Sequence, residues 1–581
     1  MEQLAKLLPK LKKFQDYIED VNKSNFPINI SGLSESAKAH FIYATRFYSK
    51  KPVIVLTYNE IELKKMQKDL EFFEDETVQV FPKREIVYYD IDTMNKDVTM
   101  ERLKCFSDLY NSQNGIILTT IEALMQKTIN KQKLFENVLH IEVGKEYGLE
   151  KIKEQLINIG FERADLCDGK GLFSVRGGII DVYPITEKNP IRIEFWGDEI
   201  DSIRTFDAIS QRSISALNSI SIFPVEEFLV DKNNLGEIAD KIYDTYNAKK
   251  NHVLDRYPEI LEDIEEIRSG NYQSKIEKYF EFFFDKTSLI LDFFPKDVAI
   301  FVDEPVRIKS KAQSIEYENK EIIEDYLEKH GVVPSYTNQM SSFSEVAINL
   351  EEINAINLFR IDENMLAKRN GYSFNCREVN FFRGSLDIFL QEIQESRERG
   401  NKLLILGGVI SKCRSLATMF LEHKINTAIL ENNDTKLFEE AIENPNALEV
   451  PVMIMQGNLS SGYMLEDINL CIVAGEENNV IKEKKKSYKT KAFQEGSKVV
   501  FADLKPGDYV VHQSHGIGKY IGIHTLVIDN IRKDYLKIEY KDEDVLYVPT
   551  NQLDCIRKYM GGGEDSKPKL NRLRKQRFWK D

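Results

Sequence analysis

The sequence has no long hydrophobic run, only six cysteines and no surplus of positive charge. Because no stretch of 18 apolar residues occurs, a transmembrane helix is not predicted. The cysteines are widely spaced, and His512 and His515 have no further Cys or His nearby that would complete a metal tetrad. A disulfide framework and a metal site are therefore not expected, and the cysteine pattern fits a reducing cytoplasm.

The formal net charge of −15 restricts the class of partner. Proteins whose main task is to bind DNA usually carry the opposite sign, because Lys and Arg neutralise the phosphates. The acidic balance favours protein partners, with DNA contact made by other parts of a larger assembly. At 581 residues, of which 42% are hydrophobic and 30% charged, we expect several globular domains.

The N-terminal segment, MEQLAKLLPKLKKF, lacks the apolar core of a cleavable signal peptide. On a helix it places Leu4, Leu7, Leu8, Leu11 and Phe14 on one face. The pattern predicts a helix that docks on the protein.

Two regions, residues 25–140 and 345–480, alternate strand-like and helix-like runs and therefore predict parallel sheets. Residues 141–223 instead show the apolar–polar alternation of antiparallel strands. Residues 224–335 are mixed, with charged helical patterns and a predicted strand at 297–302. One module is thus predicted to be inserted into another.

The end of the chain has a different composition. Residues 482–491, KEKKKSYKTK, contain six lysines without apolar periodicity and predict a solvated linker. Residues 499–560 combine short strand patterns with glycine turns, which predicts a small β-barrel. The last residues, SKPKLNRLRKQRFWKD, are strongly basic.

The strand-to-helix turn ISGLSESAKAHF, residues 30–41, resembles a degenerate phosphate loop. A working loop, G-x-x-x-x-G-K-[ST], lets backbone N–H groups approach the phosphates and supplies a hydroxyl to Mg²⁺. Gly32 and Lys38 keep this spacing, but Ala37 replaces the second glycine and Ala39 has no hydroxyl. Glu35 adds a negative charge inside the loop.

An acidic pair that would hold Mg²⁺ should end a later strand, and the nearest candidate, residues 138–143, offers only Glu142. The second α/β region resembles the late strands of a helicase's second half but shows no arginine-bearing catalytic motif. We therefore predict no catalytic residues, no bound cofactor and no ATP hydrolysis by this chain.

Residues 172–207, LFSVRGGIIDVYPITEKNPIRIEFWGDEIDSIRTFD, hold the most specific pattern of the sequence. Arg176, Arg192 and Trp196 lie among the strand residues, and Arg with an aromatic on a sheet face is typical of protein-docking hot spots. Solvated strand charges beside one edge Trp would give the same pattern. The segment resembles the domain shared by excision-repair subunit UvrB and bacterial transcription-repair coupling factors. The resemblance implies that Arg176, Arg192 and Trp196 bind the damage-recognition subunit UvrA.

Two departures favour the coupling factor over UvrB. UvrB keeps an intact phosphate loop, whereas the loop with Gly32 and Lys38 is degenerate. UvrB also carries a long aromatic hairpin that inserts into damaged DNA, and the stretch from Tyr89 to Glu101 is too short to form it.

The C-terminal pattern, VVHQSHGIGKYIGIHTL followed by DYLKIEYKDEDVLYVPTNQLDCIRKY, resembles the RNA-polymerase-interacting domain shared by coupling factors and CarD-type regulators. The resemblance implies a strand that pairs with the polymerase β subunit by edge addition. By position, the residues implied are Lys519, Tyr520, Ile523, Thr525 and Leu526. Alternatively, Ile523 and Leu526 fill the core of the barrel.

The resemblance covers most of residues 1–570 and predicts the N-terminal half of a coupling factor. In that family, two RecA-like translocase domains follow, use ATP and Mg²⁺ and contact double-stranded DNA; none is present before Asp581. The predicted function is to bind stalled RNA polymerase and recruit UvrA. Three alternatives stay open: a stand-alone CarD-like regulator, a UvrB-like excision subunit, and a DNA-binding protein that uses its basic segments.

The predicted fold class is multidomain α/β plus β. It comprises a degenerate RecA-like domain with an inserted antiparallel module, a second divergent α/β domain and a C-terminal SH3/Tudor-like barrel. The predicted boundaries are 1–140 (RecA-like), 141–223 (UvrA-binding), 224–340 (UvrB-like), 341–480 (second α/β), 481–498 (linker), 499–563 (polymerase-interacting) and 564–581 (start of a connecting helix).

Overall fold

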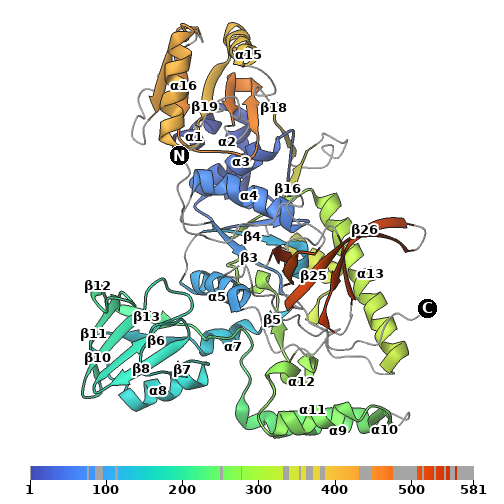
Figure 1. Cartoon of the computed structure of the whole chain (residues 1–581). Coiled ribbons are helices and arrows are strands. Elements are labelled where there is room, and N and C mark those ends of the chain that lie inside the picture. Colours follow the sequence, from blue (N-terminus) through green and yellow to red (C-terminus); the bar gives the residue numbers. More distant parts are fainter. Residues whose placement is uncertain are drawn as a thin grey trace. The chain divides into compact units, whose positions relative to one another are not determined.

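A computed structural model describes residues 2–474 and 507–558 of the chain (Figure 1). Within these ranges, the description leaves out residues 75–77, 85–95, 112–114, 249–252, 277, 331–338, 353–354, 361–370, 380–385, 431–443, 445, 447, 513–515, 529–530, 542–544 and 550–555. Contacts divide the chain into two compact units, Met1–Lys482 and Glu483–Asp581.

The largest sheet of the first unit has seven parallel strands in the order β17-β1-β16-β15-β2-β4-β3. These strands are β1 (Ile28–Ser31), β2 (Val53–Thr57), β3 (Val78–Phe81), β4 (Ile116–Thr120), β15 (Ala299–Asp303), β16 (Ala355–Phe359) and β17 (Gly371–Ser373). Alternate residues of β2 enter different hydrophobic clusters, Val53 and Val55 in one and Ile54 and Leu56 in the other. The uninterrupted apolar run of β2 therefore reflects burial on both faces of the sheet.

Helices cover this sheet and continue through the rest of the unit. They are α1 (Glu2–Ala5), α2 (Lys12–Asn22), α3 (Glu35–Ser49), α4 (Glu60–Phe73), α5 (Lys96–Tyr110), α6 (Ile121–Met125), α7 (Lys131–Glu136), α8 (Leu149–Asn158), α9 (Leu235–Asn247), α10 (Val253–Arg256), α11 (Glu259–Arg268), α12 (Phe280–Phe283), α13 (Pro305–His330), α14 (Phe343–Glu352), α15 (Leu386–Glu398) and α16 (Ile410–Glu422). The predicted N-terminal docking helix is divided at Pro9, which lies in a short 3-10 turn between α1 and α2. Its five predicted apolar residues are nevertheless all buried.

A mainly antiparallel sheet with the order β12-β11-β10-β9-β8-β7, in which only the edge strand β7 pairs in parallel, forms a separate part of the first unit. Its strands are β7 (Glu162–Arg163), β8 (Leu172–Arg176), β9 (Ile179–Val182), β10 (Ile191–Trp196), β11 (Glu199–Phe206) and β12 (Ser213–Leu217). Ile180, Ile193 and Ile203 point to one face and pack with Ile152 and Leu156 of α8. Nearby, β6 (Leu139–Glu142) pairs with β13 (Ser219–Ile222), and the short strands β5 (Thr128–Ile129) and β14 (Thr287–Ser288) also pair.

A second, mixed sheet has the order β18-β22-β23-β19-β21-β20. Its strands are β18 (Cys376–Val379), β19 (Lys402–Leu406), β20 (Thr427–Leu430), β21 (Val452–Met455), β22 (Gly462–Leu465) and β23 (Leu470–Val473). Strands β20, β21, β19 and β23 run parallel, whereas β22 and β18 add in antiparallel fashion.

A buried polar contact joins the helices of the first sheet to this second sheet. The His40 ring donates from Nε2 to the Leu4 carbonyl at 2.8 Å and accepts at Nδ1 from the Tyr463 hydroxyl at 2.9 Å. Beside it, Asp69 accepts from the Ser36 hydroxyl at 2.7 Å and from the Ser460 amide at 2.6 Å. Every donor and acceptor named here has a partner, which is what a polar contact needs when water is excluded.

The second unit holds five antiparallel strands in the order β27-β26-β25-β24-β28. They are β24 (Tyr509–His512), β25 (Gly516–Ile528), β26 (Ile531–Glu539), β27 (Val545–Pro549) and β28 (Ile556–Lys558). Among the residues described, β27 and β28 do not pair with each other, so the sheet is not a closed barrel over this part of the chain.

The mixed α/β class with several sheets, one of them fully parallel, agrees with the sequence-based prediction. The parallel sheet includes β15, β16 and β17, so this sheet draws on chain far beyond residue 140. The RecA-like assignment, the barrel closure and the domain boundaries stay predictions. In the described part of the chain, no helix combines the length and apolarity needed to cross a membrane.

Candidate docking face and phosphate-loop remnant

The register of the antiparallel sheet places the three predicted docking residues on one face. Arg192 lies opposite Asp181 of β9 and Arg204 of β11, and Arg176 lies opposite Ile179. Because strand side chains alternate between faces, Arg176 and Arg192 share the side opposite the buried Ile180 and Ile193. Helix α8 covers the other face. On the side of Arg176 and Arg192, Asp181 is buried, whereas Arg176 is exposed.

Trp196 ends β10 on the same side and is 81% exposed. Among the large hydrophobic side chains that the structure describes, only Ile209 is more exposed, at 95%. Arg176 is also exposed, and its Nη2 donates to the Asp165 carbonyl at 2.9 Å. An indole held in water at a strand end is typical of a protein contact rather than of a core.

Arg192 is held by its own sheet. Its Nε and Nη2 donate to the two carboxylate oxygens of Asp181 at 2.7 and 2.8 Å. Its guanidinium stacks on the Phe206 ring at 4.7 Å and also donates to the Gln211 side chain at 3.2 Å. The hydrogen bonds to Asp181 raise the pKa of Arg192 above its ordinary value. Arg192 therefore holds neighbouring residues of the sheet in place and also puts a positive charge on the surface of the sheet.

The phosphate-loop remnant is covered by the chain itself. Gly32 has a φ of +77°, and a Cβ atom at this position would lie 2.2 Å from the Phe374 carbonyl oxygen. The Phe374 amide donates to the Ser31 carbonyl at 3.0 Å, and the Cys376 amide donates to the Gly32 carbonyl at 3.2 Å. The backbone around Phe374 thus occupies one side of the loop that a nucleotide phosphate would need.

Lys38 is completely buried and is neutralised internally. Its Nζ donates to Asp303 Oδ1 at 2.6 Å and to Glu304 Oε1 at 2.9 Å. Burial lowers the pKa of Lys38, but the charges of Asp303, Glu35 and Glu304 outweigh this and raise it. Burial raises the pKa of Asp303 to about 6, against the opposing effect of Lys38.

The acidic pair Asp303–Glu304 was missed in the sequence. The expected candidate, Glu142, lies in the two-stranded sheet of β6 and β13 and pairs with Lys145 at 2.7 Å. The pair that faces Lys38 instead lies at the end of β15, a strand that the sequence predicts without indicating its contact with Lys38. Glu304 adopts a left-handed φ of +58°, an unfavourable conformation that its ion pair with Lys38 helps to maintain.

The residues of the C-terminal pattern all lie on β25. Tyr520 is buried and Lys519 is half-buried. Ile523, Thr525 and Leu526 lie opposite Leu536, Asp534 and Lys533 of β26. The exposure of the side chains of Ile523, Thr525 and Leu526 lies outside the description.

Strand β25 has a partner strand on both sides over only part of its length. Strand β24 pairs with β25 from Gly516 to Lys519, whereas β26 follows β25 to Ile528. Among the described residues, one edge of β25 beyond Tyr520 has no strand partner.

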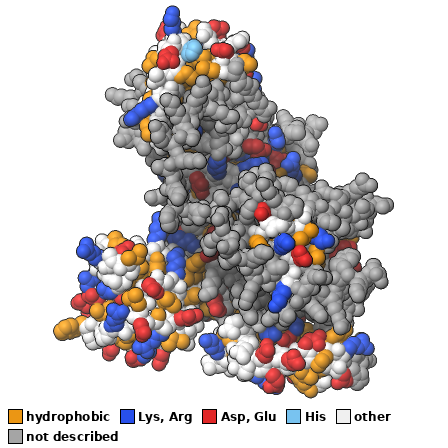
Figure 2. Space-filling model, in the orientation of Figure 1, with side chains coloured by type: hydrophobic (Ala, Val, Ile, Leu, Met, Phe, Trp, Pro, Cys, Tyr) orange, Lys and Arg blue, Asp and Glu red, His pale blue; other side chains and the backbone are white. Residues whose placement is uncertain are grey.

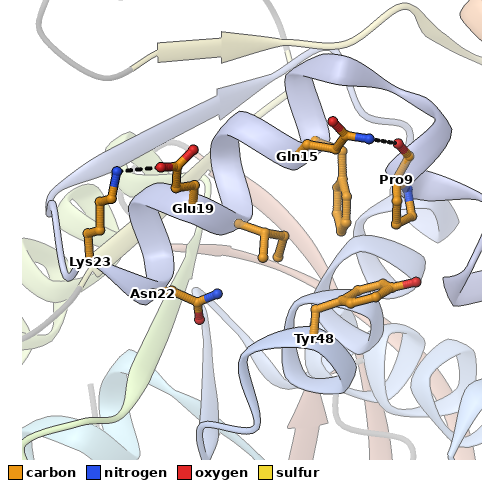
Figure 3. Close-up of a pocket in the computed structure, with 8 residues that line it drawn as sticks. Pro9, Gln15, Glu19, Asn22, Lys23 and Tyr48 are labelled. Carbon is orange, nitrogen blue, oxygen red and sulfur yellow. Dashed lines mark hydrogen bonds and ion pairs between the residues drawn. The ribbon is translucent and has the colours of Figure 1, made fainter.

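One mainly apolar pocket, with a volume of about 430 Å³, lies between α2 and Tyr48 of α3 (Figure 3). Phe14 and Ile18 contribute to its lining, and Gln15 donates to the Pro9 carbonyl at 2.6 Å on its rim. It contains none of the predicted docking residues.

Comparisons with known proteins match both patterns. The family model of the UvrB interaction domain matches residues 139–228, and that of the CarD-like/TRCF RID domain matches residues 504–560. The chain is 29% identical over 580 residues to the transcription-repair-coupling factor of Bacillus subtilis, covering 99% of this chain and 48% of the relative. The corresponding protein of Staphylococcus aureus (strain MRSA252) is 28% identical over 98% of this chain and 48% of its own length.

The chain thus spans about half the length of the curated relatives it matches. The two matched domains are those whose residues carried the resemblance in the sequence. The resemblance of this chain to the transcription-repair coupling factor family, with a UvrB-like and a CarD-like module, is thereby confirmed.

Proposed function

We propose that this chain is the adaptor part of a transcription-repair coupling factor. Its antiparallel module binds UvrA through Arg176, Arg192 and Trp196, and its C-terminal unit binds the RNA polymerase β subunit through β25. The observation that carries the proposal is that the three docking residues share one face of the sheet, on which Trp196 is 81% exposed.

The unpaired edge of β25 supports the polymerase contact. Beyond Tyr520, backbone groups on one side of β25 lack a neighbouring strand within the described residues. A strand of another protein can add to such an edge through main-chain hydrogen bonds, and side chains on alternate positions then provide specificity. Ile523, Thr525 and Leu526 lie on this part of β25.

The buried ion pairs of Lys38 support an adaptor without its own ATP turnover. Asp303 and Glu304 already neutralise the ammonium group that would otherwise meet a phosphate. Nucleotide binding would require these contacts and the Phe374 backbone to separate from the loop. We expect ATP with Mg²⁺ to leave the thermal midpoint of the purified chain unchanged, and a ligand-dependent rise would contradict this.

The two docking contacts are tested by binding assays with purified UvrA and with the purified polymerase β subunit. Trp196→Ala should weaken UvrA binding by at least about tenfold and leave polymerase binding intact. Leu526→Arg should instead weaken binding of the polymerase β subunit and leave UvrA binding intact. Matched controls are Tyr317→Ala and Leu421→Arg, which change exposed residues on α13 and α16. Equal effects of a variant and its control, or loss of both partners together, would contradict the proposal.

A further inference from the structure

Strand β12 is an uncovered edge of the antiparallel sheet. It pairs only with β11 among the described elements and is the outermost strand of the sheet order (Figure 1). Ser213, Ile214, Ser215 and Ala216 are all exposed, so neither face of the strand is packed. A strand with an open edge and two open faces is only weakly stabilised by contacts within its own protein. Such a strand readily pairs with a strand of another molecule.

No charged residue lies within β12 itself, although the exposed Arg212 directly precedes it. Residues 213–225, SISALNSISIFPV, contain no charged side chain, whereas exposed edges commonly carry Lys or another charge. The strand is short, and its register shifts near Ser213–Ser215, opposite Thr205 and Phe206. This register shift limits which strands can pair with β12. The side chain of Ile214, which is 56% exposed, offers an apolar contact to a strand that does pair.

The β12 edge adjoins the docking face, which is the side of the sheet that carries Arg176, Arg192 and Trp196. Ala216 lies opposite Arg204, which lies opposite Arg192, so the three occupy one row across the sheet. Gln211, in the turn before β12, accepts a hydrogen bond from Arg192 at 3.2 Å. Ile209, which is 95% exposed, belongs to this turn. The space-filling view shows hydrophobic side chains among charged ones over this module (Figure 2).

We propose that UvrA contributes an extended, uncharged segment that pairs with β12 and packs against Ile209 and Ile214. The inference rests on the proposed function, because it assigns a second contact to the same partner. The partner would then span the sheet from Trp196 to the β12 edge, combining side-chain anchors with main-chain hydrogen bonds. The UvrB interaction model, which matches residues 139–228, includes β12 and its turn.

The test compares two identical substitutions at exposed isoleucines of the same module. Ile214→Lys places a charge beside the β12 edge, whereas Ile157→Lys changes a 43% exposed residue on α8, which covers the other face. Using the full chain and purified UvrA, we expect Ile214→Lys to weaken binding at least about tenfold and Ile157→Lys to leave it unchanged. Hydrogen exchange should also show new protection of the amides of residues 213–217 in the complex.

Failure of this inference is distinguishable from failure of the proposed function. If Trp196→Ala weakens UvrA binding while Ile214→Lys does not, the second contact is refuted and the docking face stands. If neither variant alters binding, both are refuted. If the chain alone is a dimer that Ile214→Lys converts to a monomer, β12 pairs with a second copy and the inference is overturned.

Discussion

At the residue scale, the structure shows that two charged residues singled out by the sequence pattern have local partners within the fold. Lys38, a remnant of a phosphate loop, forms buried ion pairs with Asp303 and Glu304. Arg192, a predicted docking residue, forms a two-point ion pair with the buried Asp181. Both groups therefore have buried partners within the fold, and we expect their substitution to lower stability, an effect that binding assays alone would misread.

Lys38→Ala should destabilise the chain by about 3–5 kcal/mol, because it leaves the buried Asp303 without its counter-charge. Chemical denaturation, followed through the unfolding transition of the first unit, measures this loss of stability. Lys23→Ala is the control, since it removes an exposed ion pair with Glu19 on α2 and should have no measurable effect. Equal stability of the Lys38→Ala and wild-type proteins would show that the ion pair does not stabilise the fold.

Arg192→Ala should destabilise the antiparallel module, because Asp181 is then buried without its partner. Adding Asp181→Ala should recover part of the stability, with a coupling free energy of about 1–3 kcal/mol in a double-mutant cycle. Additive effects of the two substitutions would contradict the ion pair. Arg176→Ala is the better probe of binding, since Arg176 is exposed and its side chain donates to the Asp165 backbone carbonyl.

At the element scale, α1, α3, α4 and β22 meet around the buried His40. Its ring is hydrogen-bonded on both nitrogens and stacks on Phe73 with centroids 5.1 Å apart. Burial lowers the pKa of His40 to about 4, although the Leu4 carbonyl opposes this change. The hydrogen bonds of His40 therefore favour the neutral form of its ring.

The free energy of unfolding should consequently depend on pH through His40. A base whose pKa is lower in the folded state binds fewer protons than the unfolded chain between pH 4 and its ordinary value of 6.5. The stabilising contribution is complete above pH 6.5 and falls by about 3 kcal/mol as the pH drops to 4. Denaturation across this range should show a flatter profile for His40→Gln, whereas the exposed control His423→Gln should keep the wild-type slope. Identical slopes for all three proteins would contradict the assignment.

Sequence patterns predicted the elements better than their long-range partners. Alternation placed the strands of the docking face, and the register then brought Arg176 and Arg192 to one side. Asp303 was not connected to Lys38 because 265 residues separate them, and the neighbours of a parallel strand leave no local signature. The N-terminal docking helix that the sequence predicts is divided near Pro9, because proline has no amide hydrogen for a helix interior.

At the scale of the whole molecule, the two compact units carry the two proposed docking surfaces separately. The first unit contains the antiparallel sheet with Trp196, and the second contains β25 with its partly unpaired edge. The net charge of −15 is consistent with a molecule that mainly contacts proteins. An adaptor of this kind must bind both partners at the same time.

Simultaneous binding tests this account most directly. Immobilised UvrA is incubated with the polymerase β subunit in the presence or absence of the chain, and retained β subunit is quantified. The account predicts retention only when the chain is present, and loss of retention with either Trp196→Ala or Leu526→Arg. Binding of each partner alone but never of both together would contradict it.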